Sequence, residues 1–182
     1  MSTDIHKVFI SYHHTEPDQS YRIRFESLFA NQHQIIVNKS VQIGDIEENL
    51  NTESVRQKIR EEYLSDSTVT VVLIGNNTWQ RKHVDWEISS SIRQTKNSSR
   101  SGLIGIFLPS FQMTEDSKFN PYKIPPRLYY NFECKFATLH KWSDNPVDVK
   151  EWIHQAFDRR NSVNPNNTYE HYANNRSGLQ WQ

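Results

Sequence analysis

Residues 68–92, TVTVVLIGNNTWQRKHVDWEISSSI, decide the fold. They begin with VTVVLI at 69–74, an uninterrupted aliphatic and β-branched run. Such a run is typical of a strand that is covered on both faces in the interior of a parallel sheet. Residues 75–77, GNN, then supply turn residues, and from Val84 the apolar residues recur every four positions. The stretch therefore predicts a strand, a polar loop and a helix.

The rest of the chain repeats this alternation. Further strands are predicted at 7–12 (KVFISY), 34–37, 103–108 (LIGIFL) and 132–142, the last at an edge of the sheet. Helices are predicted from Asp18, as N-cap, to Phe29; from Thr52 to Leu64, with Arg60 facing water; and from Asn145 to Phe157. Residues 38–51 and 110–127 are predicted to be loops.

Five strands that alternate with helices predict the α/β class, a flavodoxin-like, doubly wound parallel sheet with strand order 2-1-3-4-5. A length of 182 residues fits one domain, which we place at 1–160. Residues 161–182 are polar and Asn-rich, and we expect a tail that is ordered only if something holds it.

The composition excludes several functions. Twenty-one basic and 21 acidic residues cancel, so no long-range field favours DNA or an anionic membrane. Cys134 is the single cysteine, which excludes an internal disulfide and a multi-cysteine metal site and suits the cytoplasm. No apolar run approaches the roughly 18 residues of a membrane span, and the N-terminus does not resemble a signal peptide.

The predicted strand order brings three polar clusters to one crevice, because ligands of open α/β sheets bind beyond the carboxyl ends of the strands at the switch point. Tyr12 and His13 follow the first strand, Asn76 and Trp79 follow the third, and Glu87 lies on the next helix. On a helical wheel Glu87 falls between the apolar stripe and solvent, which predicts a half-buried carboxylate.

Simpler interpretations stay open for each residue. Acidic side chains early in a helix, here Asp85 and Glu87, are favoured by the helix dipole alone. Trp79 suits a core position, and His13 and His14 suit an ordinary loop.

Several known chemistries do not fit. The five glycines form neither a dinucleotide-binding GxGxxG nor a phosphate-binding GxxxxGK[ST] pattern, and no HExxH or GxSxG motif is present. A phosphoacceptor receiver domain would need acidic residues after the first and third strands, where this chain has Tyr12-His13 and Asn76-Asn77.

Three motifs, KVFISYHH, TVTVVLIGNNTW and HVDWEI, resemble the Toll/interleukin-1 receptor-like (TIR-like) domain family and, more narrowly, the bacterial TIR proteins of the Thoeris antiphage defence system. The resemblance covers residues 7–157. It implies an enzyme that cleaves the nicotinamide–ribose bond of NAD, with NAD as substrate and neither a cofactor nor a metal. The catalytic glutamate of the family falls on Glu87.

The resemblance also implies roles and partners. Glu87 would stabilise the positive charge that builds on the ribose, while Tyr12, His13, Asn76 and Trp79 would bind the nucleotide. We expect a cyclic or otherwise modified ADP-ribose product that reaches a separate effector protein. A phage-derived trigger and a homo-oligomer are left open.

Two competing functions remain at this stage. A non-catalytic TIR-like scaffold would assemble with other proteins, and a nucleotide-sensing module would bind without turnover. The polar crevice with Glu87 favours the enzyme.

Overall fold

The computed structural model describes residues 4–39 and 52–182. The strands of the described residues are β1 (His6–Ser11), β2 (Ile36–Asn38), β3 (Val69–Ile74), β4 (Gly102–Phe107) and β5 (Ala137–Lys141). The α-helices are α1 (Asp18–Glu26), α2 (Thr52–Lys58), α3 (Lys82–Ser91), α4 (Pro126–Glu133) and α5 (Pro146–Ser162). α1 and α2 continue into π-helical turns at Ser27–Gln32 and Ile59–Tyr63, and short 3₁₀ turns lie at Thr78–Gln80 and Pro121–Lys123.

The strands form one parallel sheet in the order β2-β1-β3-β4-β5. This confirms the α/β flavodoxin-like prediction. The order reverses between β1 and β3, where Val8 is paired with Val69 and Ser11 with Val72. In such sheets a crevice forms beyond the carboxyl ends of these two strands.

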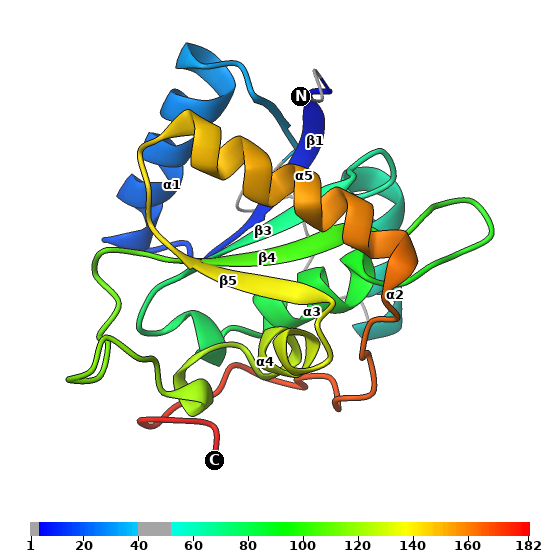
Figure 1. Cartoon of the computed structure of the whole chain (residues 1–182). Helices are drawn as coiled ribbons and strands as arrows, with labels where there is room; N and C mark the ends of the chain where they lie inside the picture. The colour runs from blue at the N-terminus through cyan, green and yellow to red at the C-terminus, as the bar shows by residue number, and fades with distance from the viewer. Residues whose placement is uncertain (1–3, 40–51) are drawn as a thin grey trace.

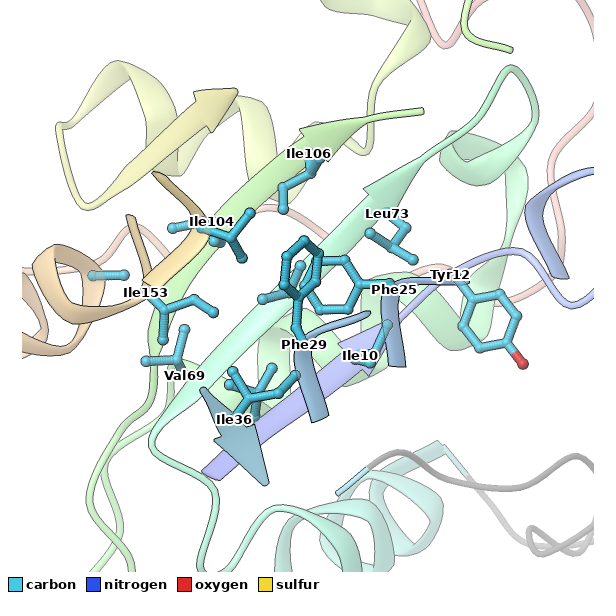
Figure 2. Close-up of a cluster of buried hydrophobic side chains, with 14 of the residues drawn as sticks. Ile10, Tyr12, Phe25, Phe29, Ile36, Val69, Leu73, Ile104, Ile106 and Ile153 are labelled. Atoms are coloured by element: carbon cyan, nitrogen blue, oxygen red, sulfur yellow. The ribbon is translucent and has the colours of Figure 1, made fainter. Parts of the chain in front are cut away.

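Both faces of the sheet are covered. Figure 1 shows α1 and α5 on one face and α3 and α4 on the other. Side chains of β3 pack on both faces of the sheet. Val71 and Leu73 pack into the cluster with α1 and α5, whereas Val72 and Ile74 pack with α3 and α4. Figure 2 shows the first cluster, where Phe25 and Phe29 lie over the strands. Double-sided burial explains the unbroken apolar run of β3.

Two predicted elements were wrong in extent. The predicted loop at 110–127 contains the 3₁₀ turn Pro121–Lys123 and the start of α4, and the predicted strand at 132–142 is reduced to β5. The helical period of α4 was hidden because two polar residues, Arg127 and Asn131, occupy its buried face.

Two predicted side-chain positions were also wrong. Pro17, not Asp18, is the N-cap of α1, and Asp18 is buried with its carboxylate near the Thr78 hydroxyl. Arg60 does not face water but is buried, donating to the carbonyls of Ser90 and Ser91 near the end of α3. Each has a partner distant in sequence that satisfies its polar group.

The tail after α5 is held against the domain. Figure 1 shows it running past α4 and α3 to the C-terminus. Asn131 donates to the carbonyl of Asn166 (2.7 Å) and accepts from its backbone N–H (2.9 Å), and the Trp181 indole donates to the carbonyl of Ile124 (2.9 Å). Side chains of α4 and carbonyls of the loop before it therefore hold the tail, as the sequence analysis required for an ordered tail.

None of the helices in residues 4–39 and 52–182 has the length and apolar character needed to cross a membrane.

Candidate active site

Glu87 lies on α3 and points to the end of β1. Its Oε2 accepts a hydrogen bond from the Ser11 hydroxyl. Ser11 extends to the same face of β1 as Phe9, because side chains alternate along a strand. Phe9 packs against Trp86 of α3, so this face of the strand meets the helix that carries Glu87.

Glu87 is only 2% exposed, which corrects the prediction of a half-buried carboxylate. The helical wheel places Glu87 beside the apolar stripe, but Ser11 at the end of β1 meets that flank of the helix as well. Residues 84–91 of α3 are all buried. Within the described residues no Lys or Arg forms an ion pair with Glu87. Burial raises its pKa from 4.5 to about 8, although the Ser11 hydrogen bond opposes the shift.

The residues after β1 reach the start of α3 through a row of tilted aromatic rings. The His14 ring lies 4.4 Å from the Tyr12 ring and 4.6 Å from the His83 ring, between centroids. His83 Nε2 is 3.0 Å from the carbonyl oxygen of Tyr12. The structure therefore brings residues 12–14 and α3 together.

His83 and Ser11 were missed in the sequence. A usable signal existed for His83, because it precedes Glu87 by four residues and therefore shares its helix face. Ser11 was detectable as the polar residue that ends β1 after the apolar run Val8, Phe9 and Ile10.

The histidines of this cluster are held in their neutral form. Burial, with the charges of Arg81 and His83, lowers the pKa of His13 to about 4. Burial and the neighbouring His83 and His13 lower the pKa of His14 to about 4 as well. Neutral imidazoles at physiological pH are able to accept a proton.

Tyr12 is buried rather than open to a ligand. Its ring belongs to the core beside α1, and its hydroxyl donates to Gln19 Oε1 at 2.8 Å. Its backbone carbonyl, which contacts His83, is the part that faces α3.

Asn76 and Trp79 have structural partners. Asn76 donates to the carbonyl of Ser110 and accepts from the N–H of Gln112, both at 2.9 Å, so it fastens the loop after β4. Trp79 is fully buried, and its carbonyl accepts the Tyr172 hydroxyl at 2.8 Å. In the described part of the chain, neither side chain forms a hydrogen bond with Glu87.

A second buried carboxyl lies near the switch point. Asp18 is within 3.3 Å of the Thr78 hydroxyl, and burial raises its pKa to about 6. Gly75 permits this close approach, because a Cβ at that position would lie 2.2 Å from Asp18 Oδ2. Asp18 thus packs the turn after β3 against α1.

Open cavities occur elsewhere on the domain. One of about 480 Å³ lies between α2 and the end of α3, lined by Arg60, Arg93 and their neighbours. Another of about 270 Å³ lies beside Phe107, Met113 and Trp142 at the ends of β4 and β5. Neither is lined by Glu87. Among the described residues no group of three or more His, Cys, Asp or Glu is arranged to hold a metal ion.

One segment expected to enclose the crevice, residues 40–51 of the predicted loop 38–51, lies outside the described residues. The other, within 110–127, is anchored by Asn76 at its start.

The arrangement offers two buried carboxyl groups, Glu87 and Asp18, and neutral histidines near the switch point. Glu87 is able to stabilise a cation once it is ionised, and His13 is able to take up a proton.

Comparison with known proteins assigns the family. A family model described as Thoeris protein ThsB, TIR-like domain, matches residues 9–113. A comparison with curated proteins finds no match. The matched residues cover more than half of the chain and include the end of β1 with Ser11, and α3 with His83 and Glu87. The chain therefore belongs to the Thoeris ThsB family, with a TIR-like domain of the antiphage defence system.

Proposed function

We propose that this chain is an enzyme of antiphage defence that cleaves the nicotinamide–ribose bond of NAD, with Glu87 as the catalytic carboxylate. The observation that carries the proposal is the buried Glu87 carboxyl at the end of β1, bonded to Ser11 and without an ion-pair partner among the described residues. Burying such a group costs folding free energy, and perturbed acids of this kind cluster at functional sites. The match to the Thoeris TIR-like family also supports Glu87 as the catalytic residue in this proposal.

The chemistry follows from the charge of the substrate. The bond between ribose C1′ and the nicotinamide nitrogen breaks, and its electron pair neutralises the positively charged ring. Positive charge moves to the ribose as an oxocarbenium-like species, which the Glu87 carboxylate stabilises. A nucleophile then attacks C1′ and loses a proton, which neutral His13 takes up in this proposal.

The arrangement described here is a closed form of the proposed site. Because Glu87 is buried and its pKa is about 8, its carboxyl is protonated at neutral pH. Turnover uses the ionised form, so the substrate must reach Glu87 while α3 stays in place beside β1, and its positively charged ring must then lower the pKa of Glu87. A phage-derived trigger would act at this step.

The test is nicotinamide release. The purified protein is incubated with NAD, with and without extract from phage-infected cells, and nicotinamide is measured by chromatography. Glu87→Gln is expected to lower the rate by at least about 100-fold, the usual cost of removing one electrostatic stabiliser of the transition state. Glu151→Gln is the matched control, because Glu151 is exposed on α5 and bonds only to Gln155.

Circular dichroism and melting curves establish that both variants fold. A folded Glu87→Gln variant that releases nicotinamide at the parent rate would remove Glu87 from the mechanism. A parent protein that releases none under either condition would favour the non-catalytic scaffold or the nucleotide sensor.

A further inference from the structure

Tyr172 connects the C-terminal tail to the helix that carries Glu87. Its backbone N–H donates to Asp85 Oδ2 at 3.1 Å, and its carbonyl accepts from the Trp86 indole at 2.9 Å. Asp85 and Trp86 are the two residues immediately before Glu87. The Tyr172 hydroxyl donates to the carbonyl of Trp79, and its side chain is 2% exposed. One tail residue is thus bonded both to α3 and to the turn before it.

The same segment caps the start of α3. The N-cap residue, Arg81, makes no capping hydrogen bond with its side chain. Instead Asn175 Oδ1 accepts from the Lys82 N–H at 2.9 Å, and the Arg176 N–H donates to the carbonyl of Gln80 at 2.8 Å. Helix N-termini carry N–H groups without intrahelical partners, so such a contact fixes where the helix begins.

A buried ion pair anchors this segment to α4. Arg127, fully buried, pairs with Asp85 at 2.9 Å, and it also donates to Asn167 Oδ1 (2.9 Å) and to the carbonyl of Tyr169 (2.8 Å). Arg176 lies over the Tyr172 ring at 4.0 Å. The contacts are mutually connected, and a connected buried polar network is rigid.

These contacts cover one flank of α3, on which the Trp86 ring also packs against Phe9 of β1. Val84 and Ile88 pack toward the strands and Glu87 meets Ser11, while Asp85, Trp86 and Ser89 bond to the tail. We propose that residues 166–178, the C-terminal strap, press α3 against β1 and so set the position of the Glu87 carboxyl, with Tyr172 as the main positioning residue. The proposal rests on the proposed role of Glu87 and adds a part of the chain that the family match at 9–113 does not reach.

The experiment uses the full chain with substitutions in the strap. Tyr172→Ala removes the ring and hydroxyl, and Tyr172→Phe removes the bond to Trp79 alone. Asn175→Ala removes the cap, whereas Asn175→Asp keeps an acceptor oxygen and is expected to behave as the parent. Gln180→Ala is the matched control, because Gln180 lies beyond the strap and its Oε1 accepts from Asn120, not from α3.

Two readouts require no NAD. Amide hydrogen exchange of α3 is expected to be about tenfold faster in Tyr172→Ala, with β4 unchanged, since a loosened helix opens locally. The pKa of Glu87, followed by the carboxyl carbon resonance, is expected to fall from about 8 toward 4.5 as water reaches the group. If Tyr172→Ala does not fold, Asn175→Ala and Tyr172→Phe are expected to show smaller shifts in the same direction.

With NAD, the strap variants are expected to lose about tenfold or more in kcat with little change in KM, because misplacing a catalytic group acts on the chemical step. Equal exchange rates and an unchanged Glu87 pKa in the strap variants would overturn the inference. So would a parallel rise of exchange in α3 and β4, which indicates only global destabilisation. Absence of NAD cleavage by the parent would instead count against the proposed function, and exchange and titration would still decide the role of the strap.

Discussion

Glu87 is the residue on which the proposed chemistry depends, and its burial leads to a prediction about the stability of the fold. Its raised pKa, from 4.5 to about 8, means that the folded state binds this proton more tightly than the unfolded chain. The stabilising contribution is complete below pH 4.5 and is lost as the pH rises through about 8. The pKa values of His13 and His14 are lowered from 6.5 to about 4, so these residues have the opposite effect. They decrease the free energy of unfolding as the pH falls below 6.5.

Most of the change in stability between pH 6.5 and pH 8 therefore belongs to Glu87, with a smaller contribution of the same sign from Asp18, whose pKa is about 6. The free energy of unfolding of the parent is expected to fall there by up to about 1.4 kcal/mol per pH unit. The free energy of unfolding of Glu87→Gln is expected to change little with pH in this window, because the amide does not titrate. Urea unfolding at both ends of the window measures the difference, and equal slopes for the two proteins would mean that Glu87 is hydrated in solution.

Ser11 offers a second prediction at the same scale. Its hydroxyl favours the ionised form of Glu87, so Ser11→Ala is expected to raise the pKa of Glu87 further. The pH profile of NAD cleavage should then move to higher pH, and the rate at neutral pH should fall about tenfold. Ser20→Ala is the control, since Ser20 bonds to Glu16 on the exposed side of α1. An unmoved profile would show that Ser11 does not bond to Glu87 in the active form.

At the scale of elements, α3 and α4 are joined by the buried pair of Asp85 and Arg127. Arg127→Ala leaves a buried carboxylate without its partner and is expected to cost about 3–5 kcal/mol of unfolding free energy. The exposed pair of Lys7 and Asp66 is the comparison, and Lys7→Ala is expected to cost less than about 1 kcal/mol. Urea titrations of both variants measure these costs, and similar losses would contradict the buried assignment.

The elements also show why some predictions were wrong. Arg60 was predicted to face water on a helix and Arg127 to lie in a loop, but each donates to acceptors on a distant segment. Arg60 bonds to carbonyls at the end of α3, and Arg127 bonds to Asp85 and to the tail. Polar side chains on a buried face break the apolar period from which helices are recognised. α4 was therefore missed in part, whereas α3, with Val84, Ile88 and Ile92, was found.

For the whole molecule, the prediction concerns the product. The described residues form one α/β domain with a docked tail. The proposed reaction is expected to yield a cyclic or transferred ADP-ribose that acts on another protein. Exclusion of water from the closed site favours capture of the ribose by a nucleophile other than water. Mass spectrometry of reactions with activated protein decides this point, and linear ADP-ribose as the sole product would leave plain NAD hydrolysis.

The sequence by itself determined the strand order, the interior strands and the place of Glu87 at the start of the crevice, because these follow from periodicities within single elements and from the rules of parallel sheets. Tertiary structure alone decided that Glu87 is buried against Ser11, that Trp79 and Asn76 brace neighbouring segments, and that an Asn-rich tail is docked on α3. These features depend on hydrogen bonds between residues far apart in the chain, such as Asp85 with Tyr172, and no local pattern records such partners.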